Sequence, residues 1–295
     1  MAQYQNDVNE SRPGFADDHM ARVPSVSSPD TITCRLCEGR AKLSFETTFL
    51  KHVPVALYRC ENCESLQTND PEWLAEAYAD TRPVRDIWMV SRTERMKTLV
   101  VSVLRILRAR NARLVDWGGG NGLLVRMLRD VGVDAYRSDL YVPNYYAVGF
   151  DVENKMKAAV MTAFEVFEHS DNPRKLMREM SEHDPDFILL STKLYKDQGK
   201  DWGYLHPDSG KHVFFFSAKG LRQLGSQFGY QCVITGAYTL MHKRPIGKIR
   251  KALLKELLRR FAVHGRWLTL VDSVILYTRR GSNADFERLK TRGIL

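Results

Sequence analysis

Hydrophobic and polar positions follow two alternating patterns between residues 111 and 235. Short apolar runs, typical of buried strands, are separated by longer segments in which apolar residues recur every three or four positions, as on one face of a helix. We expect helices from 123, at 173–181 and at 218–228, and strands at 114–117, 135–139, 159–164, 187–191 and 232–235. This alternation predicts a parallel α/β sheet with helices on both faces. A further apolar run at 274–277 is expected to form an antiparallel pair with 232–235.

Helical spacing also marks residues 71–110, ahead of the predicted sheet. Asn69 and Asp70 are suitable caps, and Pro71 suits the first turn of a helix. A second helix is expected at 87–109. Three aromatic residues of this region either cover a ligand pocket as part of a lid or pack individually in the core: Trp73, Tyr78 and Trp88.

A glycine-rich turn follows the predicted strand 114–117. Residues 116–122 read Asp-Trp-Gly-Gly-Gly-Asn-Gly. Glycine permits positive φ and lets a ligand approach the backbone, while the next helix offers free N–H groups. The spacing does not fit a dinucleotide fingerprint, which would need a third glycine at position 123 or 125, and no Lys-Ser or Lys-Thr pair completes a phosphate loop. We expect a nucleotide-like ligand of another kind; the alternative is a structural turn.

Four of the five cysteines form two Cys-x2-Cys pairs, Cys34 with Cys37 and Cys60 with Cys63, separated by 22 residues. Four thiolates at this spacing suit tetrahedral zinc, and a site filled by sulfur leaves no position open for catalysis. Disulfides would need an oxidising compartment, and a redox pair would need only one of the two motifs. We expect a structural zinc ribbon with short strands near 43–45 and 55–58. Cys232 is expected to be a small buried hydrophobe.

Two acids and a histidine, Glu165, Glu168 and His169, follow the predicted strand 159–164. Ligands of parallel α/β sheets bind beyond the carboxyl ends of the strands. A histidine with a near-neutral pKa can remove a proton from a hydroxyl or carbon acid, and a neighbouring carboxylate can orient it. The alternative is that Glu168 and His169 only cap a helix.

Residues 202–217 mix aromatic side chains with His206, Asp208 and His212 after the strand 187–191. Polar groups among aromatic rings suit a hydroxylated, sugar-like acceptor. His212 is the second catalytic candidate, its alternative being a hydrogen-bonded structural histidine. Ser217 is expected to cap the next helix.

The net charge of +9 is concentrated in one segment. Residues 243–266 hold nine Lys or Arg and one acid, 9 − 1 = +8, which leaves about +1 for the remainder. A general polyanion-binding surface is therefore not indicated, and nucleic acid is an unexpected partner. The apolar residues of the segment share one helical face, which predicts a basic amphipathic helix. It either presents a solvated basic face or contacts a membrane surface, a lipid-linked or phosphorylated acceptor, or a partner protein.

Residues 1–30 are polar, and they lack the basic start and apolar run of a signal peptide. No apolar run approaches the ~18 residues that span a bilayer. We expect a flexible N-terminal arm and a cytoplasmic protein, with the basic helix as a means of peripheral contact with the inner face of the membrane.

Five motifs occur in order: Cys-Arg-Leu-Cys, Tyr-Arg-Cys-x-Asn-Cys-x-Ser-Leu-Gln, Trp-Leu-x-Glu-Ala-Tyr, the glycine heptapeptide and Glu-Val-Phe-Glu-His. Together they resemble bacterial class I S-adenosylmethionine-dependent methyltransferases with an N-terminal zinc-binding segment, many of them associated with sugar or surface-polysaccharide biosynthesis. The resemblance covers about 31–228. It implies a Rossmann-like sheet preceded by a small zinc ribbon, with S-adenosylmethionine and zinc as cofactors.

The resemblance also implies roles for individual residues. Asp139, about 20 residues beyond the glycines, would bind the ribose hydroxyls, and Asp134 is the weaker candidate for this role. Glu165 would lie near the cofactor, Glu168 and His169 would face the acceptor, and His212 would approach the substrate. The full set of implied cofactor-binding residues is Asp116, Gly118, Gly119, Gly120, Asn121, Gly122, Asp139 and Glu165.

These observations predict an S-adenosylmethionine-dependent methyltransferase that acts on a nucleotide sugar or a surface-glycan precursor, with His169 as general base helped by Glu168 or His212. One alternative is an RNA methyltransferase with a zinc knuckle; another is a non-catalytic, cofactor-binding scaffold. The expected organisation is an arm at 1–30, the ribbon at 31–70, a helical linker or lid at 71–110, the methyltransferase domain at 111–282 with the basic helix 243–266 inserted, and a tail at 283–295.

Overall fold

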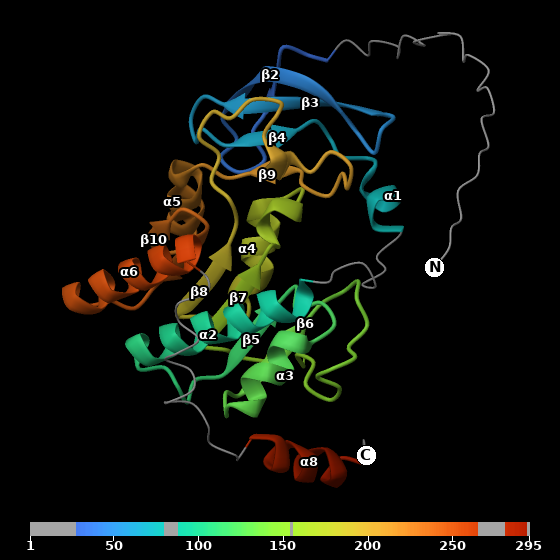
Figure 1. The fold of residues 1–295 in the computed structure, drawn as a ribbon. Helices are drawn as coiled ribbons and strands as arrows, with labels where there is room; N and C mark the ends of the chain where they lie inside the picture. The colour runs from blue at the N-terminus through green and yellow to red at the C-terminus, as the bar shows by residue number, and fades with distance from the viewer. Residues whose placement is uncertain (1–27, 80–87, 154–155, 265–280, 294–295) are drawn as a thin grey trace, which may run out of the picture.

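The computed structural model describes residues 28–79, 88–153, 156–264 and 281–293. Within these residues it contains a six-stranded sheet, in the order β10-β11-β8-β7-β5-β6, and a five-stranded sheet, in the order β1-β2-β3-β4-β9 (Figure 1). The predicted fold class, an α/β sheet with helices on both faces preceded by a small ribbon, is confirmed.

Four parallel strands form the centre of the larger sheet and match the predicted segments closely: β5 (Leu114–Trp117), β6 (Ala135–Ser138), β7 (Val160–Phe164) and β8 (Phe187–Ser191). The first of them, β5, lies between β6 and β7, so the strand order reverses at β5. Ligands of open α/β sheets bind beyond the carboxyl ends of the strands at such a reversal. The topology therefore places the site where β5 and β7 end.

Two antiparallel strands complete the sheet: β10 (Gln231–Thr235) and β11 (Tyr238–His242). They form a hairpin whose turn contains Gly236 at φ +58°. β11 pairs with both β10 and β8 and is not among the predicted strands. The predicted strand at 274–277 lies outside the described residues.

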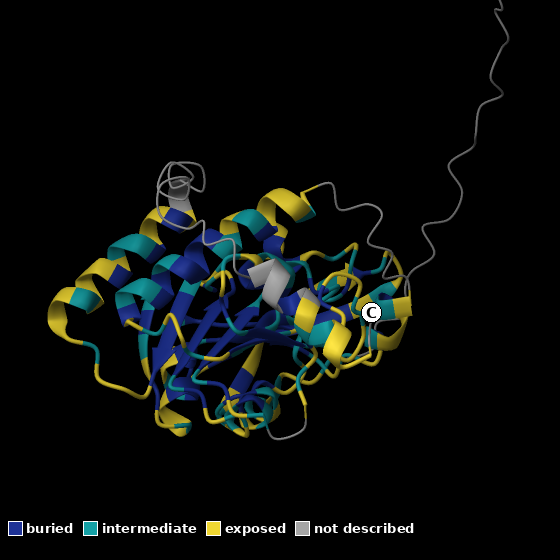
Figure 2. Cartoon of the chain, turned by 90° about the horizontal axis from the view of Figure 1, so that it is seen from below, coloured by how far each residue is buried: buried dark blue, intermediate teal, exposed yellow. Residues whose placement is uncertain are grey.

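Helices form a layer on each face of the buried sheet (Figure 2). One layer holds α2 (Met89–Leu107), α3 (Leu123–Asp130) and α6 (Lys248–His264), because α2 packs against both of the others. The other layer holds α4 (Pro173–Ser181) and α5 (Ala218–Gln227). The helices begin at side-chain caps where the sequence supplies them: Asn172 accepts from the Lys175 N–H, and Ser217, as predicted, accepts from the Gly220 N–H.

A last helix, α8 (Gly281–Thr291), docks on α3. Its Asp285 is 5 % exposed and accepts hydrogen bonds from Arg126 and Arg129. The described part of the predicted C-terminal tail is thus packed on the domain by a buried ion pair.

The smaller sheet contains the ribbon: β1 (Thr31–Thr33), β2 (Arg40–Phe49), β3 (Val53–Cys60) and β4 (Leu66–Thr68), with the short helix α1 (Leu74–Ala79) after it. Its fifth strand, β9 (Phe214–Phe215), follows β8 of the larger sheet in the sequence and pairs with β4. Buried residues of the ribbon such as Leu36 and Tyr58 share one hydrophobic cluster with Phe214 and with the core of the larger sheet. The ribbon and the α/β sheet are therefore built as one packed unit.

Candidate active site and metal centre

The glycine-rich turn after β5 uses three glycines in the left-handed region, Gly118 (φ +68°), Gly120 (φ +54°) and Gly122 (φ +86°). A Cβ at Gly118 would lie 2.6 Å from Val166 Cγ2, and one at Gly122 would lie 2.6 Å from Asn144 Oδ1. A Cβ at Gly120 would meet no described atom within 4 Å. Packing therefore requires glycine at 118 and 122, whereas Gly120 leaves open space beside the backbone, as a bound ligand needs.

Asp116 lies near the end of β5 but does not face that space. Its side chain is 4 % exposed, lies beneath the turn and accepts a 2.6 Å hydrogen bond from Thr162 Oγ1. Burial raises the pKa of Asp116 to about 7, an effect that the Thr162 hydrogen bond partly opposes. The structure gives this residue a position that supports the turn from below; the implied direct contact with a cofactor stays a prediction.

Asp139 ties the glycine turn to the segment after β6. One carboxylate oxygen accepts from the Gly120 N–H at 2.9 Å, and the other accepts from the N–H groups of Tyr141 and Val142, both at 2.9 Å. Arg137, which is not among the predicted site residues, donates to the Gly120 carbonyl at 2.5 Å. An arginine inside an apolar strand carries no motif that would have revealed this contact. The predicted ribose-binding acid is thus held at the open glycine.

Asn121 is also held in place at the turn. Its side-chain amide donates to Met89 Sδ at 3.2 Å, and its side-chain oxygen accepts from the Leu123 N–H at 3.2 Å. Met89 is the first residue of α2. Of the lid aromatics, Trp73 is buried against Phe49 in the ribbon, whereas Trp88 is 67 % exposed.

Glu165 follows β7 in the left-handed conformation, at φ +54°. Its carboxylate accepts a 2.6 Å hydrogen bond from Ser191 Oγ, and its N–H donates to the same oxygen at 3.0 Å. Ser191 ends the neighbouring strand β8. Left-handed conformations of residues other than glycine, Asn or Asp are uncommon and gather at functional sites. The contacts with Ser191 hold the Glu165 carboxylate at the carboxyl edge of the sheet.

Glu168, His169 and His212, here called the Glu–His–His cluster, lie together although His212 is far away in sequence. Glu168 and His169 belong to the 3-10 helix η2 (Phe167–His169), and the two imidazole ring centres are 4.8 Å apart. Each residue offers a ligand atom within 4.8 Å of the others. The structure thus brings together the three predicted catalytic residues.

The side chains of the cluster are largely buried, and burial shifts the pKa of each of the three residues. Burial raises the pKa of Glu168 well above its usual range and lowers the pKa of His169. Burial together with the His169 charge lowers the pKa of His212 to about 3. Both imidazoles are therefore neutral near pH 7. A neutral imidazole is the form that accepts a proton or binds a cation.

Tyr204, in the 3-10 helix η3 (Gly203–Leu205), was not singled out by the sequence analysis. Its hydroxyl donates a short hydrogen bond to Glu168 Oε1, and its carbonyl accepts from His212 Nδ1 at 2.7 Å. Tyr78, one of the three lid aromatics, stacks on Tyr141 at 5.7 Å and meets the His169 ring edge-on at 6.4 Å. Aromatic rings thus border the cluster on two sides.

The ribbon positions His212. β9 begins two residues after His212 and pairs with β4 of the ribbon. Val213 lies between His212 and β9, and its carbonyl accepts hydrogen bonds from Arg35 and Thr68 of the ribbon. The Val213 N–H donates to the Glu168 carbonyl at 2.8 Å. Folding of the ribbon therefore fixes the segment that carries one member of the cluster.

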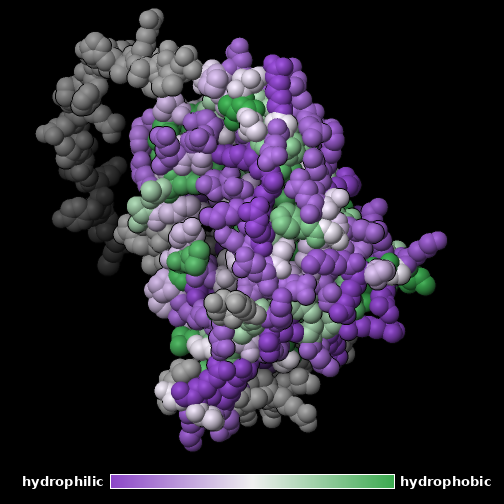
Figure 3. All heavy atoms as spheres, turned by 180° about the vertical axis from the view of Figure 1, so that it is seen from behind, coloured by the Kyte–Doolittle hydropathy of each residue, from purple (hydrophilic) through white to green (hydrophobic). Residues whose placement is uncertain are grey.

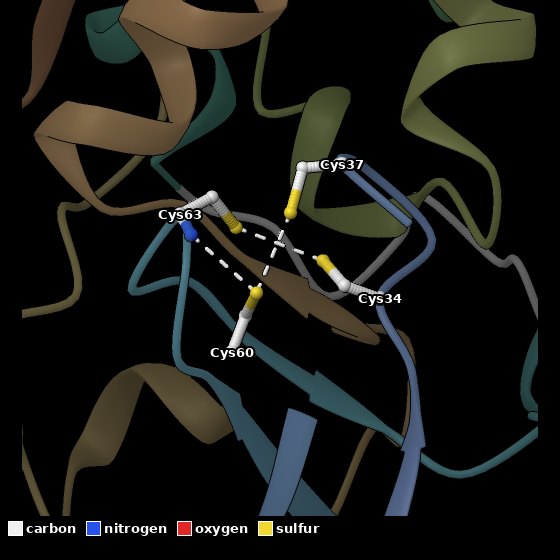
Figure 4. Close-up of side chains that lie close together, drawn as sticks. All are labelled: Cys34, Cys37, Cys60 and Cys63. Carbon is white, nitrogen blue, oxygen red and sulfur yellow. Dashed lines mark hydrogen bonds between the residues drawn. The ribbon is translucent and has the colours of Figure 1, made fainter. Parts of the chain in front are cut away.

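The four paired cysteines converge inside the ribbon (Figure 4). The Sγ atoms of Cys34 and Cys63 are 3.6 Å apart, and those of Cys37 and Cys60 are 3.4 Å apart. Tetrahedral zinc with Zn–S bonds of about 2.3 Å requires sulfur separations of about 3.8 Å. The donor set and spacing fit zinc, while Cys232 lies elsewhere, with its Sγ 3.6 Å from the Leu221 carbonyl.

The basic helix α6 buries Leu254, Leu258 and Phe261 but exposes Ile249 and Leu253. Ile249 and Leu253 therefore do not pack on the domain, as a fully docked helix would require. None of the described helices is long and apolar enough to cross a bilayer. Seen from behind, the described surface is mainly hydrophilic, with apolar residues in small groups (Figure 3).

A cleft of about 610 Å³ beside α6 is lined by arginines of α6, of the segment before it and of the end of α2. They are Arg105, Arg108, Arg110, Arg244 and Arg250. The cleft also contains Ala112, Ala159 and Phe187, at the amino ends of β5, β7 and β8. It therefore lies at the sheet edge opposite the glycine turn, and contact of this face with a membrane or partner stays a prediction.

A family model described as "Methyltransferase domain" matches residues 91–235, which include the glycine turn and the whole Glu–His–His cluster. Residues 91–235 are therefore similar to a methyltransferase domain. The predicted enzyme class, an S-adenosylmethionine-dependent methyltransferase, is confirmed by this match. A search of curated proteins found no match for the chain.

Several solved methyltransferase structures resemble the chain at low identity. The 1,6-didemethyltoxoflavin-N1-methyltransferase of Burkholderia thailandensis, with bound 1,6-didemethyltoxoflavin and S-adenosylhomocysteine, is 13 % identical over 63 % of this chain and 93 % of its own, with a TM-score of 0.42. The magnesium protoporphyrin IX methyltransferase of Synechocystis PCC 6803 is 14 % identical over 57 % and 90 %, with a TM-score of 0.38. An O-methyltransferase family protein of B. thailandensis is 15 % identical over 60 % and 64 %, with a TM-score of 0.43. These likenesses are too weak to carry a functional argument.

Proposed function

We propose that the methyltransferase transfers the methyl group of S-adenosylmethionine to a sugar-like acceptor, a nucleotide sugar or a surface-glycan precursor. The observation that carries the proposal is the adjacency of two sites on paired strands. The open glycine turn ends β5, the Glu–His–His cluster follows β7, and these strands are hydrogen-bonded neighbours. A cofactor at the turn and an acceptor at the cluster would meet at one edge of the sheet.

The groups at the cluster suit a hydroxylated acceptor. Carboxylate, imidazole and phenol groups of Glu168, His169 and Tyr204 stand among aromatic rings, including Tyr78 and Tyr141. Such a mixture binds the faces of a sugar ring through apolar contact and its hydroxyls through hydrogen bonds. Methyl transfer is an in-line displacement that requires alignment of acceptor and sulfonium and removal of one proton, and the cluster supplies groups for the second task.

The ribbon, with zinc bound by its four thiolates, would stabilise the fold and the position of His212 rather than take part in chemistry. Because thiolates stay reduced in the cytosol, the proposed location is the cytoplasm.

The first test is calorimetric titration with S-adenosylhomocysteine of the wild type, of Asp139→Ala and of Asp134→Ala as a matched control. Asp134 is an acid at the opposite end of β6 that pairs with Arg113 and Arg129. We expect micromolar binding by the wild type and the control, and at least tenfold weaker binding by Asp139→Ala. Equal affinity of all three proteins would remove the ribose role of Asp139, and absence of binding to the wild type would contradict the proposed function.

The second test is the transfer of radiolabelled methyl groups to a panel of nucleotide sugars and cell-surface glycans, with RNA as a comparison. Transfer to a sugar supports the proposal, whereas transfer to RNA alone contradicts it. Cofactor binding without transfer to any member of the panel would favour a scaffold.

A further inference from the structure

Glu168 has a buried carboxylate oxygen that makes no hydrogen bond within the described part of the chain. The residue is 0 % exposed, and its Oε1 is taken by the Tyr204 hydroxyl. Its Oε2 has no hydrogen-bond partner among the described residues. A buried oxygen left unpaired costs about 1–3 kcal/mol, and more if charged, so a ligand that binds this oxygen would remove that cost.

The two histidines of the cluster make the same kind of hydrogen bond, from Nδ1 to a backbone carbonyl. Nδ1 of His169 lies 3.0 Å from the Lys211 carbonyl, and Nδ1 of His212 lies 2.7 Å from the Tyr204 carbonyl. A carbonyl only accepts, so each Nδ1 carries the hydrogen and each Nε2 keeps its lone pair. Metal-ligating histidines have this arrangement, in which a backbone carbonyl holds one ring nitrogen and the other binds the ion.

The spacing allows one ion to reach all three residues. Their ligand atoms lie within 4.8 Å of one another. Bonds of about 2.1 Å at a four- to six-coordinate ion need ligand separations of about 3.0–3.4 Å, so modest side-chain rotations close the difference. Two imidazoles and one carboxylate suit first-row transition ions and leave coordination positions open. Tyr204 holds the carboxylate from behind, as outer partners of metal ligands do.

We propose that the Glu–His–His cluster binds a divalent first-row transition-metal ion through Glu168, His169 and His212, and that this ion binds a hydroxyl oxygen of the acceptor. The proposal rests on the proposed function for its acceptor, but the ion site is defined by the protein alone. The bound ion lowers the pKa of the hydroxyl, whose proton passes to water. The acceptor O–CH3 bond forms as the S–CH3 bond of the sulfonium breaks, which leaves neutral S-adenosylhomocysteine. The histidines then act as ligands, and no imidazole serves as the base.

The experiment is a titration of the full-length protein with Mn²⁺, followed by the electron paramagnetic resonance signal of the free ion. Dialysis against a chelator first empties sites of nitrogen and oxygen donors, and a zinc assay verifies that the ribbon stays loaded. Soft thiolates favour zinc over Mn²⁺, so the ribbon does not contribute to the signal. The variants are Glu168→Gln and His212→Asn. The matched control is His242→Asn, since His242 is 2 % exposed and its Nδ1 also faces a backbone carbonyl, that of Arg244.

We expect the wild type and His242→Asn to bind about one Mn²⁺ per chain, and both cluster variants to bind it at least tenfold more weakly. Each variant is also titrated with S-adenosylhomocysteine, whose site at the glycine turn reports whether the fold is intact. If one cluster variant no longer binds S-adenosylhomocysteine, its fold is not intact, and the Mn²⁺ affinity of the other variant tests the proposal. No saturable binding by the wild type, or unchanged affinity in a folded cluster variant, overturns the inference and returns the base role to His169. Mn²⁺ binding without any S-adenosylhomocysteine binding would contradict the proposed function while the ion site stands.

Discussion

The open space beside Gly120 gives the sharpest test of the cofactor site. We consider Gly120→Ala together with Gly229→Ala. Both glycines adopt positive φ, +54° and +80°, and an added Cβ would meet no described atom within 4 Å at either position. Gly229 lies between α5 and β10, away from the glycine turn. The two substitutions therefore differ in one respect, which is whether a ligand occupies the space that the methyl group fills.

The expected magnitudes follow from this geometry. An alanine in the left-handed region costs about 1–2 kcal/mol, so both variants should lose a similar amount of unfolding free energy. Overpacking against a ligand costs about 1–3 kcal/mol, so only Gly120→Ala should bind S-adenosylhomocysteine more weakly, by about 5- to 150-fold.

Urea denaturation measures the first quantity and calorimetric titration the second. Wild-type affinity in Gly120→Ala, with the stability loss present, would mean that the cofactor does not lie against this glycine. A much larger stability loss in Gly120→Ala than in Gly229→Ala would show that the space is filled by protein, and would refute the reasoning as well.

Two further predictions concern the metal centre and a buried acid. Cys34→Ser should abolish binding of about one equivalent of zinc by the ribbon and lower the denaturation midpoint, because all four thiolates are needed for a closed site. The control Cys232→Ser should change neither the zinc content nor the midpoint. Metal analysis after gel filtration measures the zinc content, and zinc retained by Cys34→Ser would contradict the prediction. The raised pKa of Asp116 means that the folded state holds this proton more tightly than the unfolded chain, so the contribution is fully present below about pH 4 and is lost as pH rises toward 7. Asp116→Asn removes that loss, so its unfolding free energy relative to wild type should rise by about 2–3 kcal/mol between pH 5 and pH 8. Urea titrations at both pH values measure this difference. A difference that does not change with pH would show that the Asp116 pKa is ordinary.

Local pattern alone predicted the four parallel strands, the helices α3, α4 and α5, and two motifs. The strand 114–117 and the helix 173–181 occur at the predicted residues, because an apolar run and a capped helical repeat act through near neighbours. The glycines at 118–122 and the paired cysteines were likewise readable, since positive φ and thiolate ligation each require one residue type.

Tertiary structure decided how these parts act. The pairing of β9 with the ribbon, the Tyr204 hydrogen bond to Glu168 and the Arg137 contact with Gly120 join residues with no fixed sequence relation. The same holds for burial: Asp116 lies beneath the turn and Leu253 of α6 lies in solvent, although the motif and the helical face suggested otherwise. Sequence spacing sets which side chains share a face of one element, but the distance, exposure and protonation of groups on different elements are fixed only when those elements pack.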